Sequence, residues 1–313
     1  MIYFRIKNIP IRKKAVLAPM LEFTNLPFRL LAKEYGAGLT YTEMIHVQYL
    51  LNANISEIPI LKTDVNDTPT AVQLVGDFTK KETIDAAHKL DNLKSFDIID
   101  FNFGCPSQKV MAGNAGSMLL KDISKSIPII KEIKETTNKP ITVKTRLGYN
   151  QNNINEIIAN FEKANIDGIA IHARASNELY NVKSNDDVVK NLISKTSIPI
   201  IYNGDVNEDN FQKFLDFPGI MIGRAALGNL FVFKQINNFL KNSSLLKKNE
   251  LEGITELKRY LQLCEKYNFN WLDIKKTVIP FISGFNGASN LRNQLSQVTD
   301  AQQFKEIINK QLM

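Results

Sequence analysis

Eight short apolar segments, each bounded by turn residues, alternate with segments of helical pattern up to residue 224. They span residues 15–20, 38–44, 70–76, 97–103, 140–146, 168–174, 198–205 and 219–224. The intervening segments carry helix signals, which include Pro27 just inside one start, the amphipathic stretch 80–93, and Asp122 as a cap for 123–137. Strand and helix alternation predicts a parallel sheet, and eight repeats predict a closed (β/α)8 TIM barrel. We expect the leading segment 2–11 to form a small hairpin that closes the barrel floor.

Strand parity predicts polar side chains inside this barrel. In the segment 140–146, Ile141 and Val143 share one face and should pack on the helices, which turns the alternate side chains toward the barrel axis. The same rule places Val72, Leu74, Phe101, Phe103, Ile169 and Ile171 outward. The inward side chains then include Asp100, Thr142 and Ala170 and, at the barrel mouth, Gln73, Asn102, Lys144, Arg146, His172 and Arg174.

The inward cations need a partner, because burying an unpaired charge costs roughly several kcal/mol or more. A bound anionic, polar cofactor would supply that partner. Gly204 and Gly223 lie at strand ends just before expected helices, so backbone N–H groups and Arg224 could hold a phosphate after the last two strands. This phosphate site would serve any phosphorylated ligand, and by itself it does not distinguish a phosphorylated cofactor from a sugar phosphate.

A single cysteine lies in the segment 101–120, directly after the apolar run 97–103. Gly104 and Pro106 end the predicted strand, so Cys105 falls on a loop at its carboxyl end. Active sites lie at that end of the strands in parallel-sheet folds. The alternative interpretation is a small, inert residue in a turn.

The segment around Cys105 resembles the tRNA-dihydrouridine synthases, flavoenzymes that reduce uridine in tRNA. The residues that carry the resemblance are Asn102, Gly104, Cys105, Pro106, Lys109 and Val110, followed by the Gly-rich turn 113–117. The segment 18–29, APMLEFTNLPFR, resembles the family's first-strand motif, and 281–292, FISGFNGASNLR, resembles its C-terminal signature. The similarity extends over essentially the whole chain. Segment 175–186 departs most clearly from the family pattern.

The resemblance implies a set of site residues. The FMN contacts would be Pro19, Met20, Gln73, Lys144 and His172 along the flavin ring and its chain, and Asn203, Gly204, Asp205, Gly223 and Arg224 at the phosphate end. The tRNA substrate would be contacted by Asn102, Arg146 and Tyr180 at the target uracil and by Lys109 at a phosphate.

The implied chemistry is the reduction of the uracil C5–C6 double bond to give 5,6-dihydrouridine. Flavin N5 would deliver a hydride to C6, Cys105 would donate a proton to C5, and NADPH or NADH would supply the electrons. As a general acid, Cys105 must remain a neutral thiol at rest.

With 313 residues, the chain is long enough for a barrel and a smaller domain. We predict an FMN-binding catalytic barrel over 1–235 and a helical tRNA-binding domain over 240–313. The net charge of +7 suits a polyanionic partner such as tRNA. Basic residues suited to phosphate contacts in the helical part are Lys247, Lys248, Lys258, Arg259, Lys275, Lys276 and Arg292.

Other patterns favour a cytoplasmic protein without a membrane segment, because no run of about 18 apolar residues and no signal-peptide core occurs. Cys105 and Cys264 are far apart, so a structural disulfide is not expected. We assign no metal, because the three histidines come without a CxxC pair or an HExxH pattern. We take the chain as a monomer, although the sequence does not define the oligomeric state.

Two other functions stay open. One is a barrel flavoenzyme of the dihydroorotate or dihydropyrimidine dehydrogenase kind acting on a free pyrimidine, which would have no need of a basic helical region. The other is a non-catalytic RNA-binding barrel protein, which would bind no yellow chromophore and would not depend on Cys105.

Overall fold

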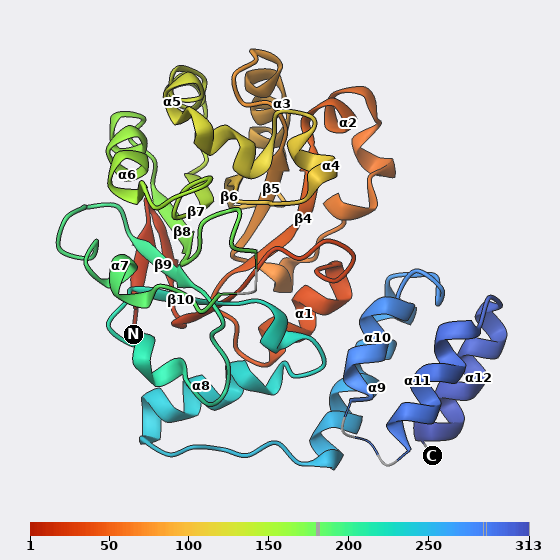
Figure 1. Ribbon diagram of the computed structural model, residues 1–313. Helices are drawn as coiled ribbons and strands as arrows, with labels where there is room; N and C mark the ends of the chain where they lie inside the picture. Colours follow the sequence, from red (N-terminus) through yellow and green to blue (C-terminus); the bar gives the residue numbers. More distant parts are fainter. Residues whose placement is uncertain (180–181, 284, 286, 313) are drawn as a thin grey trace.

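The computed structural model describes residues 1–179, 182–283, 285 and 287–312. Its centre is a sheet of eight strands in the order β3-β10-β9-β8-β7-β6-β5-β4, with every neighbouring pair parallel (Figure 1). The strands are β3 (Ala15–Leu17), β4 (Thr40–His46), β5 (Thr70–Val75), β6 (Ile98–Phe103), β7 (Ile141–Arg146), β8 (Gly168–His172), β9 (Ile200–Asn203) and β10 (Gly219–Ile222). The predicted TIM barrel and the position of each strand are therefore confirmed.

Two backbone hydrogen bonds join β3 to the residues that lead into β4. The N–H of Gly38 donates to Ala15 O at 2.8 Å, and the N–H of Leu17 donates to Leu39 O at 2.9 Å. These bonds link the first and last strands of the sheet order, so the sheet curves round into a barrel.

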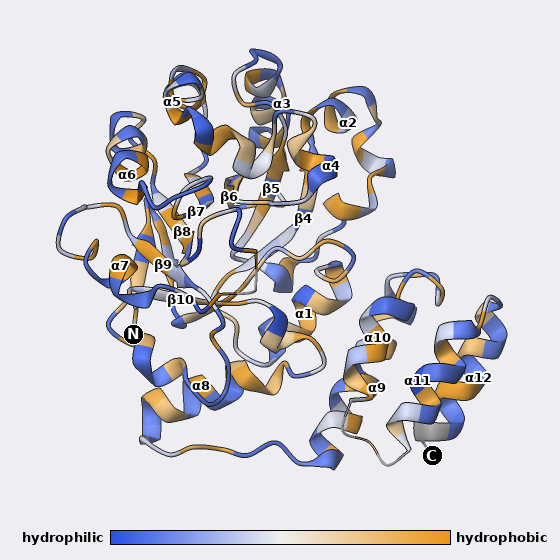
Figure 2. Cartoon of the chain, viewed as in Figure 1, coloured by the Kyte–Doolittle hydropathy of each residue, from blue (hydrophilic) through white to orange (hydrophobic). Residues whose placement is uncertain are grey.

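The predicted strand parity is also confirmed. Outward residues such as Ile141 and Val143 belong to a large core shared with the helices. Inward residues, including Ala71, Ile98, Ala170 and Met221, form a second, smaller core inside the barrel. In Figure 2 the hydrophobic colouring follows the strands, whereas the helices carry hydrophilic residues on their outer sides.

The N-terminal hairpin closes the barrel floor as expected. Strands β1 (Phe4–Ile6) and β2 (Ile9–Ile11) pair antiparallel, and Phe4, Ile6 and Ile11 join the inner core. A Cβ on Gly219, the first residue of β10, would lie 2.9 Å from the Phe4 ring of the hairpin. A side chain at this position would therefore prevent the close contact between β10 and the hairpin.

Helices surround the barrel (Figure 1). They are α1 (Leu26–Glu34), α2 (Val47–Asn52), α3 (Glu82–Asp91), α4 (Gln108–Met111), α5 (Ile127–Thr136), α6 (Ile154–Lys163), α7 (Asp186–Lys190) and α8 (Phe231–Asn242). Short 3-10 turns complete the connections, at η1 (Ile55–Glu57), η2 (Pro59–Leu61), η3 (Val65–Asp67), η4 (Gly116–Lys121), η5 (Ile123–Lys125), η6 (Phe211–Phe214) and η7 (Arg224–Ala226).

Some helix predictions require correction. Pro27 does lie in the first turn of α1, and Asn25 caps that helix. Asp122, however, makes no capping hydrogen bond, and it precedes the 3-10 turn η5, whereas α5 begins only at Ile127. The segment after Gly204 contains the 3-10 turn η6 in place of the expected helix, and the 3-10 turn η7 separates Gly223 from α8, which begins at Phe231.

The C-terminal helices are α9 (Glu250–Lys266), α10 (Lys275–Phe281), α11 (Ala288–Gln297) and α12 (Ala301–Leu312). Of these, α9 and α10 lie nearer to the barrel, and α11 and α12 form the outer layer (Figure 1). Tyr260 packs against the rings of Phe28 and Phe281, and its hydroxyl accepts a hydrogen bond from Asn25 at 2.9 Å. The helical region is thereby fastened to α1 through a buried aromatic contact.

The domain boundary proposed at 235–240 falls inside α8. This helix packs on the barrel, where its Asn237 donates to Gly36 O at 2.8 Å, and the connection 243–249 follows it. We therefore propose that the helical region starts at α9. Within the described residues, no helix has the length and apolar character needed to cross a membrane.

Candidate active site

A cavity of about 1100 Å³ lies at the carboxyl ends of the strands and extends to the helical region. Twelve of the predicted site residues line it, namely Pro19, Met20, Gln73, Asn102, Cys105, Lys144, Arg146, His172, Asn203, Asp205, Gly223 and Arg224. Gly204 and Lys109 do not line it, and Lys109 is exposed on α4. The remaining predicted residue, Tyr180, lies outside the described residues.

Positive charge dominates the inner wall of this cavity. Burial, followed by the charges of Lys144, Arg146, Arg174 and Arg224, lowers the pKa of His172 to about 2. Burial and the charge of Arg146 lower the pKa of Lys144 to about 8, although Asp100 opposes that shift. Cations gathered in this way favour an anionic ligand.

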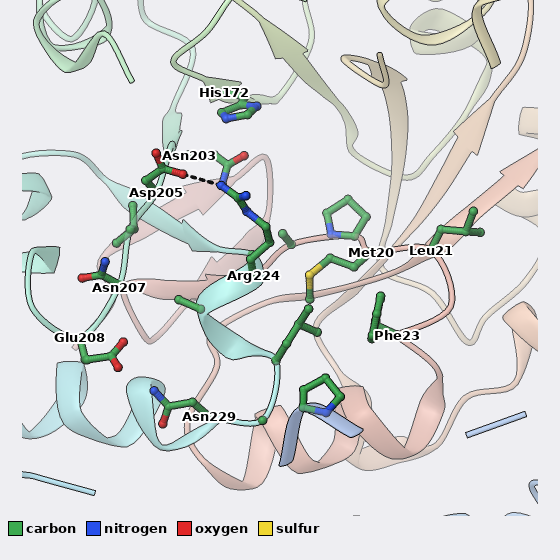
Figure 3. A pocket seen from close by; sticks show the side chains of 18 of the residues that line it. Met20, Leu21, Phe23, His172, Asn203, Asp205, Asn207, Glu208, Arg224 and Asn229 are labelled. Atoms are coloured by element: carbon green, nitrogen blue, oxygen red, sulfur yellow. Dashed lines mark hydrogen bonds and ion pairs between the residues drawn. The ribbon is translucent and has the colours of Figure 1, made fainter. Parts of the chain in front are cut away.

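Arg174 connects two residues of the cavity wall, His172 and Asp205, with the backbone at Val182. Its guanidinium donates to Nε2 of His172 at 3.1 Å and to the carbonyl of Val182, and it pairs with Asp205. Asp205 also accepts from Arg224 at 2.7 Å, a contact drawn in Figure 3 beside Met20 and Asn203. The hydrogen bond from Arg174 and the two arginine charges lower the pKa of Asp205. A carboxylate repels phosphate, so Asp205 could favour a bound anion only through its hold on Arg224.

Lys144 on β7 is held by Asn203 on β9, two strands away in the sheet. Its Nζ donates to Oδ1 of Asn203 at 3.2 Å, while Nδ2 of Asn203 donates to Met221 O at 3.1 Å. This pair of bonds aims the ammonium group at the cavity that both residues line. An anionic or carbonyl-bearing ligand in this cavity could therefore accept a further hydrogen bond from the ammonium group.

The backbone around Cys105 is fixed from both sides. Oδ1 of Asn102 accepts from the N–H groups of Gly104 and Cys105 at 3.0 and 2.9 Å. On the other side, the N–H and the hydroxyl of Ser117 both donate to Cys105 O at 3.0 Å. Gly116 adopts φ +61°, and a Cβ there would lie 2.7 Å from Cys105 O, so the turn needs glycine at this position.

Arg146 bridges two loops. Its Nε donates to Gly104 O at 2.8 Å and its Nη1 donates to Ala175 O at 3.0 Å, with only 2% of the residue exposed. Ser117 and Ser176 join the same loops through a hydroxyl contact of 2.5 Å. The structure thus gives Arg146 a loop-holding role. Its predicted contact with substrate stays a prediction.

Cys264, His46 and His88 do not line the cavity, and their contacts are structural. Cys264 is fully buried, and burial raises its pKa to about 12, so the interpretation as a packed core thiol is confirmed. His46 caps α2, where its side chain accepts from the N–H of Gln48 at 3.3 Å. His88 contacts Thr136 on the surface at 2.8 Å.

Sequence reasoning missed several residues of the site. Strand parity predicts that Asp100 and Arg174 lie inside the barrel, but we assigned them no function from the sequence. Their charge at an inward position was a signal that could have identified them. Phe23 and Met44 line the cavity, and Glu43 accepts from the N–H of Glu22 at 2.6 Å next to it. No pattern in the sequence identified these three residues.

The residues present fit a flavin mononucleotide. The cations Lys144 and Arg224 and the ring of His172 offer donors for a phosphate and for ring carbonyls. Only Ala18 Cβ, at 3.8 Å, approaches the position of a Cβ on Gly223, so the backbone there is open to a ligand. Pro19 and Met20 provide an apolar wall.

Comparison with known proteins gives a consistent result. A family model described as "Dihydrouridine synthase (Dus)" matches residues 16–313. The "Probable tRNA-dihydrouridine synthase" of Rickettsia conorii is 30% identical over 315 residues, which cover 92% of this chain and 92% of that protein. The "tRNA-dihydrouridine synthase B" of Escherichia coli (strain K12) is 35% identical over 262 residues, which cover 81% of this chain and 80% of that protein.

Solved structures resemble the barrel. Morphinone reductase in complex with tetrahydroNAD has a TM-score of 0.53 and 10% identity, covering 79% of this chain and 91% of that chain. The old yellow enzyme homologue from Zymomonas mobilis has a TM-score of 0.50 and 12% identity, covering 79% of this chain and 93% of that chain. At such identities the likeness shows the fold alone.

Proposed function

Because the chain belongs to the dihydrouridine synthase family, we propose that it reduces specific uridines in tRNA to 5,6-dihydrouridine, with FMN as cofactor and NADPH or NADH as reductant. The observation that carries the proposal is that Cys105 lines the same cavity as the cations Lys144, Arg146 and Arg224. A thiol and a set of cations around one cavity suit a reaction that needs a proton donor and an anionic cofactor.

Lys144, His172 and Arg224 would hold the cofactor. Arg224, oriented by Asp205, would bind the phosphate, and Lys144 would lie against the carbonyl edge of the ring. When bound, reduced FMN would supply the hydride that the uracil C6 accepts. Lys144 would stabilise the negative charge that the reduced cofactor carries before the hydride leaves it.

Cys105 would complete the reduction. As the hydride forms a bond at C6, the π bond between C5 and C6 breaks, and C5 takes the proton from the thiol of Cys105. Solvent would return a proton to the thiolate before the next turnover. The thiol must stay reduced for this role, which a cytoplasmic location would favour.

The target base would have to leave the RNA stack to reach Cys105, at a cost of roughly a few kcal/mol. We propose that the helical region and Lys109 bind the surrounding tRNA phosphates. Of the basic residues considered for this role, Lys248 and Arg259 pair with Glu256 and Glu34, and Lys276 pairs with Glu22. Lys247 and Lys258, which are exposed, are therefore the better candidates.

The decisive experiment is mass spectrometry of tRNA from a deletion strain, complemented with the wild-type protein and with Cys105→Ala. Dihydrouridine should disappear at one or more positions on deletion and return only with the wild type. Unchanged dihydrouridine at every position in the deletion strain would contradict the proposal. Parallel assays of the full-length protein on free uracil and dihydroorotate test the free-pyrimidine alternative.

A further inference from the structure

A buried carboxylate lies inside the barrel and has no part in the proposed reaction. Asp100 is on β6, is fully buried, and faces the barrel axis two residues before Asn102. Its Oδ2 accepts from Nε2 of Gln73 at 2.7 Å, and its Oδ1 accepts from the hydroxyl of Thr142 at 2.6 Å. Burial raises its pKa to about 6, so the group is ionised at neutral pH and above.

The hydrogen bonds continue from this carboxylate to the backbone of Cys105. Oε1 of Gln73 accepts from Nδ2 of Asn102 at 2.9 Å. Oδ1 of Asn102 in turn accepts from the N–H groups of Gly104 and Cys105. The two amide side chains are 1% and 8% exposed, so water has little access with which to replace these bonds.

We call the series of hydrogen bonds from Asp100 through Gln73 and Asn102 to the backbone of Cys105 the relay. The direction of every hydrogen bond in the relay is set by its two ends. An ionised carboxylate only accepts hydrogen bonds, and backbone N–H groups only donate. Gln73 must therefore turn its NH2 group to Asp100 and its oxygen to Asn102. Asn102 must then turn its NH2 group to Gln73 and its oxygen to the Cys105 turn. If either amide flipped, two donors or two acceptors would face each other in a buried place.

We propose that Asp100 is a positioning residue for Cys105, acting through Gln73 and Asn102 to hold the turn that carries the thiol. The inference rests on the proposed function for the role of Cys105 as proton donor. A proton donor must lie within hydrogen-bond reach of the atom that it protonates, and a misplacement of about 1 Å can lower a rate by roughly 100-fold. The relay also orients the second N–H of each amide side chain. That of Gln73 is available to the cavity that the residue lines, and the amide nitrogen of Asn102 lies 3.8 Å from Met44 Sδ.

The test compares Asp100→Ala with Thr142→Val in the full-length, FMN-loaded protein. Both variants remove buried hydrogen bonds from the same place, but only Asp100→Ala breaks the relay. We expect Asp100→Ala to slow single-turnover uridine reduction about 100-fold, and Thr142→Val to change it less than about 3-fold. Asp100→Asn should retain most of the rate, because its oxygen can still accept from Gln73 if the Thr142 hydroxyl rotates to accept from its NH2 group.

A double-mutant cycle separates positioning from general destabilisation. In a Cys105→Ala background, Asp100→Ala should cost less than about 3-fold more, because the residue through which it acts is already absent. An equal cost in both backgrounds would overturn the inference. If the wild type reduced uridine no faster than Cys105→Ala, the role of Cys105 as proton donor, and with it the inference, would fail. If the FMN-loaded wild type reduced no uridine, the proposed function itself would fail, which is a different outcome.

Alkylation by iodoacetamide gives a readout that needs no turnover. Release of the turn should raise the alkylation rate of Cys105 at least 5-fold in Asp100→Ala and leave it unchanged in Thr142→Val. The buried Cys264 reports global unfolding in the same sample. An unchanged Cys105 rate would overturn the inference. If Asp100→Ala does not fold, Asp100→Ser, whose hydroxyl is too short to reach Gln73, takes its place under the same criteria.

Discussion

The guanidinium of Arg174 donates a hydrogen bond to Nε2 of His172 across 3.1 Å. A guanidinium remains protonated and only donates, so Nε2 must be unprotonated and the proton of the neutral ring lies on Nδ1. The surrounding cations keep the ring neutral, with a pKa lowered to about 2 by burial and by their charges. His172 is therefore a donor of defined tautomer and does not titrate as an acid at physiological pH.

This arrangement predicts how stability depends on pH. The folded-state pKa of His172 lies below the unfolded value of about 6.5, so the unfolded chain binds the proton more readily. Its contribution is complete above pH 6.5 and is lost as pH falls. Urea titrations at pH 7.5 and 5.5 should show that His172→Gln loses less stability than the wild type, by up to about 1.4 kcal/mol per pH unit. An equal loss would show that the ring is not held neutral.

Arg224 predicts selective recognition of the cofactor phosphate. Arg224→Met should weaken FMN binding about 10- to 100-fold, because a charge-assisted hydrogen bond contributes about 1.5–3 kcal/mol. Riboflavin, which has no phosphate, should bind both proteins equally. Flavin fluorescence titration of the apoprotein measures both affinities, and parallel losses for the two ligands would place Arg224 away from the phosphate.

The barrel and its inward residues were predictable because side chains alternate strictly along a strand. Because Val143 and Ile171 face outward, the adjacent Lys144 and His172 must face inward, and both do line the cavity. Resemblance then assigned each a role, and most of the assigned residues do meet in one cavity.

The remaining contacts depend on segments that meet only in the folded chain. Asp205 was assigned to the phosphate end, yet its carboxylate lies between Arg174 and Arg224. Arg146 holds two loop carbonyls. Such partners are set by the packing of loops from different strands, and neither periodicity nor local turn signals carries that information.

Gly116 predicts a local stability requirement under the Cys105 turn. Gly116→Ala should destabilise the fold by about 2 kcal/mol or more, because it forces an alanine to φ +61° with its Cβ 2.7 Å from Cys105 O. Gly113→Ala is the matched control, since the nearest atom to its Cβ is Val110 O at 3.5 Å. Urea unfolding should show a change within about 0.5 kcal/mol for the control. If Gly116→Ala changed the free energy of unfolding as little as the control does, the turn would tolerate a side chain at Gly116.

Glu22 lies at the junction of the barrel mouth and the helical region, in the left-handed conformation with φ +69°. Its N–H donates to Glu43 at 2.6 Å, its carbonyl accepts from Thr277 at 3.1 Å, and its carboxylate pairs with Lys276 at 2.5 Å. The ion pair is more than half exposed on both sides, so we assign it little weight beside the backbone geometry.

Two substitutions at Glu22 separate these effects. Glu22→Gly removes the ion pair but suits a positive φ, so the free energy of unfolding should stay within about 1 kcal/mol of the wild type. Glu22→Val also removes the ion pair, but a β-branched residue resists the left-handed region, so it should cost about 2 kcal/mol more than glycine. Urea unfolding of the two variants and of Lys276→Met decides between backbone and charge. If Lys276→Met and Glu22→Gly were both as damaging as Glu22→Val, the charge would be the dominant contribution.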